Sequence, residues 1–179
     1  MMILKRVTLL LSIFTVVVCY SFQVPNPLLK KVRKAVEKTF EIKDVILEPL
    51  LIDSTLQTKL HKSIEKDHLF KIVNNEQLIG YAFIDKAPSK TDVFDYLILL
   101  DANLVIVKAK VLTYREDYGS EIGSRRWLKQ FIGKGSEDHF KYGNQIMAIS
   151  GATISAHSMT RAINTFLKNL EILHKNNIL

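Results

Sequence analysis

The 179-residue sequence predicts an α+β fold: an antiparallel sheet of hairpins packed against a C-terminal helix, with an N-terminal helix. Two features predict it. Apolar segments at 69–73 and 78–84 flank a polar turn, and a second such pair lies at 96–100 and 104–112, which is the pattern of β-hairpins. Toward the C-terminus, apolar residues recur at alternating spacings of four and three, as on one face of an amphipathic helix.

Local patterns set the bounds of the other elements. After Pro27, the apolar residues of 28–39 recur at a spacing that would place them on one face of a helix, with the lysines away from that face. This pattern predicts a helix over 28–39. Residues 45–52 predict a strand. The four-three spacing, which begins at Met159, predicts the last helix over 155–174. The chain then divides into a leader, a helical and mixed extension, and a C-terminal domain, at 1–21, 22–68 and 69–179.

Composition excludes several classes of protein. Hydrophobic residues make up 47% of the chain, which is enough for a packed core and excludes a disordered protein. The formal net charge is +7, but the basic residues form no blocks of the kind that bind nucleic acid. Cys19 is the only cysteine, and the five histidines lack zinc-site spacing, so neither an internal disulfide nor a metal site is expected.

The first segment predicts export. Lys5 and Arg6 precede an apolar run over 7–18, which is the order of a secretory signal. Cys19 and Ser21 suit the positions before a cleavage site, so cleavage after Ser21 is expected. An uncleaved membrane anchor is the alternative, because the run is close to the length of a membrane span. Either case places the protein in the periplasm or at the outer face of the cytoplasmic membrane.

Six of the seven glycines lie between Gly119 and Gly151, interleaved with aromatic residues. Glycines let a ligand approach the main chain and aromatics suit a planar ligand, although a loop-rich edge of the core explains the composition equally well. The segment Ser150–Ser155 then precedes the last helix. Its small and hydroxyl residues suit either helix capping or an anion bound at the helix N-terminus.

The motifs in this region resemble the bacterial FMN-binding domain family, which includes the FMN-carrying subunits of the sodium-pumping NADH:quinone oxidoreductase and the Rnf complex. The resemblance covers residues 69–170 and rests on the sequence SGATIS at 150–155, YREDYGSEIG at 114–123 and WLKQFIGK at 127–134. It implies FMN as the cofactor, esterified through its phosphate to Thr153 by a flavin transferase. The residues expected at the cofactor are Thr153, Ser150, Gly151, Ala152, Ser155, Tyr118, Gly119, Glu121 and Trp127.

One position departs from the family pattern. The transferase target carries an Asp three residues before the serine of SGAT, and Met147 stands there. This departure concerns covalent attachment more than FMN binding. His157, one helical turn after Thr153, is a candidate for contacting the phosphate. The basic residues Arg115, Arg125, Arg126 and Lys129 would place positive charge near the flavin ring, or else form surface ion pairs.

Three functions compete at this point. The leading hypothesis is an exported electron-transfer flavoprotein, a carrier whose partners are a redox protein or a membrane electron-transport complex. The second is an FMN-dependent reductase of a small molecule, for which Tyr114, Tyr118 and His139 are the available proton donors. The third is a binding module that keeps the fold without the cofactor. Detection of bound flavin would distinguish the cofactor-free binding module from the two flavoproteins. Turnover of organic acceptors would distinguish the reductase from the electron carrier.

Overall fold

The computed structural model describes residues 27–179, so the predicted leader lies outside the described residues. The chain divides into two compact units, Met1–Lys30 and Lys31–Leu179, and all of the strands belong to the second. The fold is α+β, as predicted. Within residues 27–179, no helix combines the length and apolar character needed to cross a membrane.

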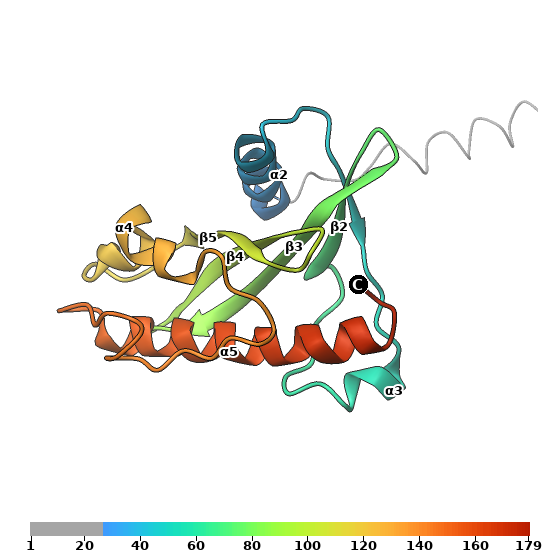
Figure 1. The fold of residues 1–179 in the computed structure, drawn as a ribbon. Helices are drawn as coiled ribbons and strands as arrows, with labels where there is room; N and C mark the ends of the chain where they lie inside the picture. Colours follow the sequence, from blue (N-terminus) through green and yellow to red (C-terminus); the bar gives the residue numbers. More distant parts are fainter. Residues whose placement is uncertain (1–26) are drawn as a thin grey trace, which may run out of the picture. The chain divides into compact units, whose positions relative to one another are not determined.

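The second unit is built on one antiparallel sheet of five strands in sequential order (Figure 1). The strands are β1 (Ile46–Pro49), β2 (Leu69–Asn74), β3 (Gln77–Pro88), β4 (Val93–Asp101) and β5 (Ile106–Thr113). Both predicted hairpins are therefore confirmed: β2, β3 and β4 extend beyond the predicted apolar runs, whereas β5 begins two residues later and ends one residue later than its run. The predicted strand at 45–52 shortens to β1, which pairs with β2 and so belongs to the same sheet.

Tight turns set the register of the hairpins. Asn75 and Glu76 both have positive φ, 48° and 64°, which suits the two-residue turn between β2 and β3. In the turn between β4 and β5, the Asp101 carboxylate accepts hydrogen bonds from the amides of Asn103 and Val105, each at 2.9 Å. Alternate residues of each strand point to the same face of the sheet, and the turns determine which of them lie opposite one another on neighbouring strands.

One face of the sheet is covered by α5 (Thr153–Lys175), which runs along it in Figure 1. The Phe166 ring stacks on that of Phe83 in β3, with centroids 3.9 Å apart and planes 3° from parallel. Met159 and Ile163 are completely buried. The predicted helix and its apolar stripe are confirmed, and the stripe forms the core of the unit.

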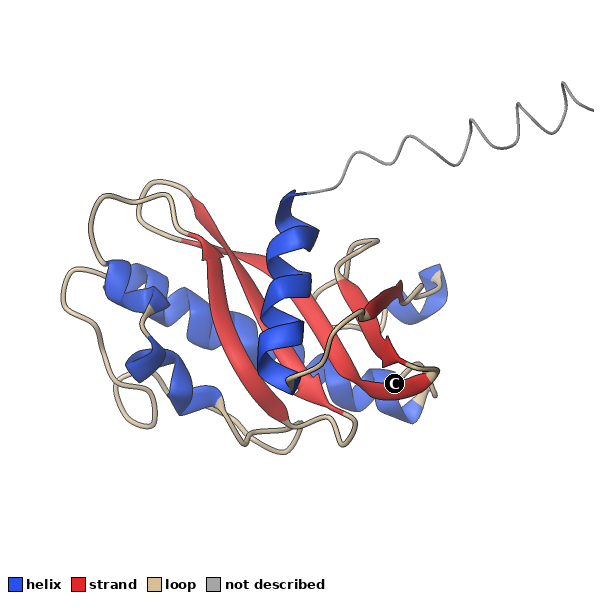
Figure 2. Cartoon of the chain, turned by 90° about the horizontal axis from the view of Figure 1, so that it is seen from above, coloured by secondary structure: helices blue, strands red, loops and turns tan. Residues whose placement is uncertain are grey.

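The opposite face carries residues 31–40 of α2 (Pro27–Phe40), which cross it in Figure 2 and bury Val32 and Val36. From this helix the Lys31 ammonium donates to the carbonyl of Leu112 in β5 at 3.0 Å. The predicted helix at 28–39 is confirmed. Four short helices complete the structure: α3 (Ser54–Gln57), η1 (Ser120–Gly123), α4 (Arg125–Leu128) and η2 (Lys129–Phe131).

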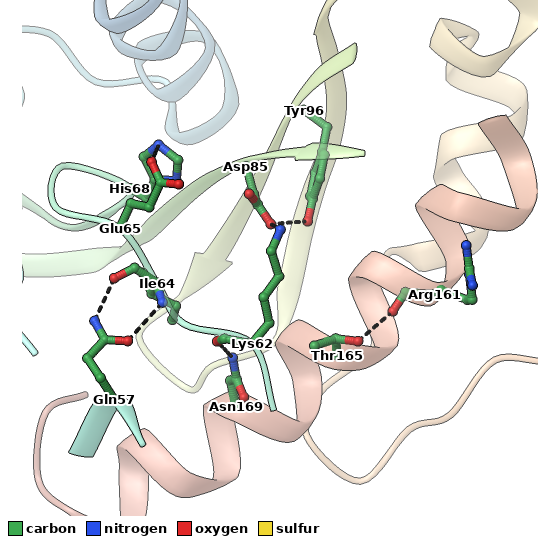
Figure 3. A network of polar contacts seen from close by, with 10 residues as sticks. All are labelled: Gln57, Lys62, Ile64, Glu65, His68, Asp85, Tyr96, Arg161, Thr165 and Asn169. Atoms are coloured by element: carbon green, nitrogen blue, oxygen red, sulfur yellow. Dashed lines mark hydrogen bonds and ion pairs between the residues drawn. The ribbon is translucent and has the colours of Figure 1, made fainter. Parts of the chain in front are cut away.

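Asn169 ties the segment between α3 and β2 to α5 (Figure 3). Its side chain is 2% exposed, and its amide nitrogen donates to the carbonyl of Lys62 at 2.8 Å. Its amide oxygen accepts from the backbone amide of His61 at 2.8 Å. Both functions of the carboxamide are thus used to hold a connecting segment that lacks strand or long-helix structure of its own.

Asn169→Ala is expected to lower the free energy of unfolding by about 1–3 kcal/mol, because it removes the two hydrogen bonds that the buried carboxamide makes to the backbone of residues 61 and 62. Thr165→Ala is the matched control on the same helix, since the Thr165 hydroxyl is exposed and bonds only the Arg161 carbonyl at 3.0 Å. Urea unfolding of both variants measures the difference. Equal stability of the two variants would show that Asn169 does not anchor the segment.

Candidate functional site

The first turn of α5 is left without a side-chain cap. The residue at the N-cap position is Ala152, with φ −131° and ψ 28°, and it offers no side-chain oxygen. The Ala152 carbonyl accepts the first helical hydrogen bond, from Ala156 at 2.9 Å, so the amides of residues 153–155 precede the helical ladder. Within residues 27–179, no side chain caps them. This favours an anion site over capping, the two explanations that the sequence left open.

The chain just before the helix leaves these amides accessible. Gly151 is exposed, has a φ of +78°, and has open space where a Cβ would stand. Thr153 is also exposed, and its hydroxyl has only a long contact, 3.5 Å, to the carbonyl of Ile149. A ligand phosphate therefore has an open approach to both the amides and the Thr153 hydroxyl.

Gly119 packs the upstream motif against this turn. Its φ is +76°, and a Cβ added there would lie 2.6 Å from the Cβ of Ala152 and 2.9 Å from the carbonyl oxygen of Gly151. Only glycine permits both this backbone conformation and this approach. The motifs at 114–123 and 150–155 are thereby brought into direct contact.

Between them lies a cavity of about 430 Å³, here called the α5 pocket. This volume is within the range of small-molecule and cofactor sites. The residues that line it are Lys90, Tyr114, Glu116, Tyr118, Gly151, Ala152, Thr153, Ile154 and Ser155. The pocket thus joins the helix N-terminus, two aromatic rings and a single lysine.

The polar groups of the pocket differ in their availability. Ser155 is 2% exposed and its hydroxyl is 3.0 Å from that of Tyr114, so these two groups bond to each other. Tyr118 is 82% exposed, and its ring is free to lie against a planar ligand. Lys90 is exposed, and it is the one residue with a positively charged side chain among those that line the pocket.

Glu116 fixes the loop that follows β3. Its carboxylate accepts from the Thr91 amide at 2.7 Å and from the Thr91 hydroxyl at 2.9 Å. Hydrogen bonding to Ser89, followed by that to the Thr91 amide, lowers the pKa of Glu116 to about 2. The ionised carboxylate therefore holds the loop carrying Lys90 at the edge of the pocket.

This arrangement predicts a pH dependence. Because the pKa of Glu116 is lower in the folded protein, its stabilising effect is complete above about pH 4.5, the ordinary pKa, and is lost as the pH falls toward 2. The Tm of the wild type should exceed that of Glu116→Gln at pH 7, and the difference should shrink below about pH 4.5. Asp117→Asn, which removes a neighbouring exposed charge, should keep the wild-type Tm. A Tm difference for Glu116→Gln that is constant with pH would contradict this role.

The structure brings together most of the residues that the sequence placed at the cofactor. Thr153, Gly151, Ala152, Ser155 and Tyr118 line the α5 pocket, and Gly119 packs beside it.

The other expected residues do not line this pocket. Ser150 and Glu121 are exposed, and neither is among the residues that line the pocket. Trp127 is 4% exposed, and its indole donates to the carbonyl of Met147 at 2.7 Å. The expectation that Trp127 lies at the cofactor is therefore not met in this pocket, because the side chain packs in the core.

The basic residues that were expected near the flavin ring do not line the α5 pocket. Arg115 forms an ion pair with Asp95 at 2.6 Å, which is one of the alternatives that the sequence left open. Arg125 and Lys129 line a different cavity. His157 packs edge-on against the Tyr142 ring, with centroids 5.4 Å apart, and does not line the α5 pocket.

Four lining residues were not predicted as cofactor contacts. Tyr114 and Glu116 lie within the upstream motif and Ile154 lies within the motif at 150–155, so the motifs were the signal that could have identified these three. Lys90 carries no local signal, because the turn between β3 and β4 brings it to the pocket.

Met147 occupies a well-defined place near Trp127. Its amide donates to the side-chain oxygen of Gln130 at 2.9 Å, and its carbonyl accepts a hydrogen bond from the Trp127 indole. Its side chain is 51% exposed. The backbone at this position is therefore fixed, while the side chain is open to substitution.

Comparison with known proteins identifies one family. The family model described as FMN-binding domain matches residues 92–168, from the start of β4 into α5. The match contains every lining residue of the α5 pocket except Lys90. No curated protein matches the chain.

Proposed function

Because the chain belongs to the FMN-binding domain family through residues 92–168, we propose that it is an exported electron-transfer flavoprotein that holds FMN in the α5 pocket. The family match establishes a flavin-binding module. Electron transfer, export and covalent attachment are the further parts of the proposal, and each has its own support and test.

The observation that carries the proposal is the uncapped first turn of α5. An FMN phosphate there would meet the free amides of residues 153–155 and the positive end of the helix dipole. Gly151 leaves room for the phosphate, and the exposed Tyr118 ring can lie against the isoalloxazine. The residues present therefore fit this cofactor.

Thr153 is the proposed attachment residue. A flavin transferase would use flavin adenine dinucleotide as donor: the Thr153 hydroxyl oxygen bonds to the phosphorus of the FMN half, the pyrophosphate bond breaks, and AMP leaves as the hydroxyl proton is released. The resulting phosphodiester keeps one negative charge, which the helix N-terminus stabilises. This scheme needs no general base from the chain itself beside Thr153, because the transferase performs the chemistry.

FMN in this pocket would accept and donate electrons, and the chain's own residues favour a carrier over a reductase. A reductase needs a proton donor held beside its substrate. The Tyr114 hydroxyl is already bonded to Ser155, and the Glu116 carboxylate is bonded to the loop at 89–92. Tyr118 is exposed on the open side of the pocket, where a redox partner can approach.

The localisation follows from the leader. Lys5, Arg6 and the apolar run at 7–18 support export, with the domain in the periplasm or anchored at the outer face of the cytoplasmic membrane. Residues 1–24 fused to a reporter that is active only in the periplasm should give activity. A fusion that stays inactive would remove export from the proposal.

The functional test uses the full chain, coexpressed with a flavin transferase and purified. We expect one flavin per chain by absorbance, and a bound flavin that is reduced and reoxidised by electron carriers with negligible turnover of organic acceptors. Steady turnover of a small organic acceptor would favour the reductase. A colourless protein that does not take up added FMN would contradict flavin function altogether.

A further inference from the structure

A second cavity, of about 310 Å³, lies between α2, β5 and the segment from α4 to η2. We call it the basic pocket, and it shares no lining residue with the α5 pocket. Six cationic residues line it: Lys34, Lys38, Lys108, Lys110, Arg125 and Lys129. None of its lining residues is acidic.

The fold gathers these charges in three pairs. Lys34 and Lys38 lie one turn apart on α2, so they share a face of that helix. Lys108 and Lys110 lie two residues apart on β5, which places them on one face of the sheet. Arg125 begins α4 and Lys129 begins η2, four residues later. Each pair contributes to the same cavity.

These charges are not neutralised within the described part of the chain. None of the six takes part in an ion pair there, whereas Lys62, Lys134 and Lys175 do. Burial lowers the pKa of Lys108, and the positive charges of Arg125, Lys110 and Lys38 lower it further. Gathering six like charges without a counterion destabilises the fold, so a bound anion would relieve a repulsion already present.

Apart from Thr39, whose hydroxyl donates to the carbonyl of Ala35, the remaining lining residues of the cavity carry no polar side chain. Ala35 comes from α2, Leu128 from α4, and Ile132 follows η2. Leu128 is buried, and Ile132 is 44% exposed. A ligand suited to this cavity therefore combines a multiply charged anionic group with an organic part.

We propose that the basic pocket binds the phosphate group of an organic phosphate, with its organic part against Ala35, Leu128 and Ile132. Phosphate carries the charge that several amines require, and the Arg125 guanidinium can bind two of its oxygens at once. A soluble phosphate ester and a phospholipid headgroup present this same chemistry. The site is separate from the one proposed for FMN.

The test uses the full-length protein with its flavin content measured first. Pyrophosphate binding is followed by calorimetry at low ionic strength for the wild type and for the Lys108→Gln/Lys110→Gln variant. We expect at least about tenfold weaker binding by the variant, unchanged flavin content, and a higher Tm in the absence of ligand because repulsion is relieved. Lys66→Gln/Lys168→Gln, which removes the same charge from exposed positions outside the pocket, should bind pyrophosphate like the wild type.

A second arm separates the two sources of phosphate. Vesicles of phosphatidylglycerol mixed with phosphatidylcholine are compared with phosphatidylcholine alone by co-sedimentation. Binding to the anionic vesicles that pyrophosphate displaces supports a lipid headgroup, and pyrophosphate binding without vesicle binding supports a soluble ester. The proposal is overturned if the wild type binds neither probe, or if the pocket variant and the control bind pyrophosphate equally. Loss of flavin from the pocket variant would also overturn it, because the cavity would then belong to the flavin site.

Discussion

Thr153→Ala is expected to abolish all flavin that remains with the polypeptide after denaturation. The variant has no hydroxyl to form the phosphoester, and the other hydroxyls near the turn are placed differently: that of Ser155 is buried against Tyr114. Non-covalent FMN binding should fall only about 2–13-fold, because one neutral hydrogen bond contributes about 0.5–1.5 kcal/mol and the helix amides remain. Flavin fluorescence after denaturing electrophoresis measures the covalent part, and equilibrium dialysis measures the rest.

Two further variants sharpen this result. Thr153→Ser keeps a hydroxyl and should retain part of the covalent label. Met147→Asp restores the carboxylate of the transferase pattern at an exposed side chain, so it should raise the labelled fraction without loss of stability. If Thr153→Ala keeps its label through denaturation, the attachment residue is another one.

Gly119→Ala is expected to have the second-largest effect. The positive φ costs an alanine about 1–2 kcal/mol. The added Cβ would also lie 2.6 Å from the Cβ of Ala152 and 2.9 Å from the Gly151 carbonyl, so the loop must move away from the start of α5. We expect stability to fall by about 2–4 kcal/mol and FMN affinity to fall at least tenfold.

Gly143→Ala separates the cost of the positive φ from the effect of the steric clash. Gly143 has nearly the same φ, +78°, but nothing lies within 4 Å of a Cβ added there. This variant should show only the backbone penalty, with unchanged FMN affinity. Equal loss of affinity in both variants would mean that contact between the two motifs does not shape the pocket.

The sequence was sufficient for the elements whose signal is local. The hairpin strands and α5 follow from alternation and four-three spacing within single segments, and the buried Met159, Ile163 and Phe166 confirm the helix face. The pairing of β1 with β2 was not predictable in the same way. Its burial pattern is mostly exposed, so no apolar alternation marks the strand, and its place depends on a distant partner.

In the candidate site, too, the features with a local sequence signal were predictable and those that depend on distant residues were not. The motif at 150–155 pointed to the helix N-terminus, but its residues suited both a side-chain cap and a bound anion. The structure begins the helix one residue after Ala152, which leaves the amides open. Neither Lys90 nor the basic pocket was predicted, because each depends on how the sheet and helices bring distant residues together.

Peptide mapping of the flavin tests the central claim most directly. The protein is coexpressed with a flavin transferase, denatured and digested with trypsin, which cleaves after Lys141 and Arg161 and releases residues 142–161 as one peptide. Fragmentation by mass spectrometry then identifies the modified residue among the hydroxyls of that peptide. We predict a single esterified FMN on Thr153. Flavin esterified to any other residue would contradict this assignment of the attachment site, and so would a flavin that never becomes covalent in either the wild type or Met147→Asp.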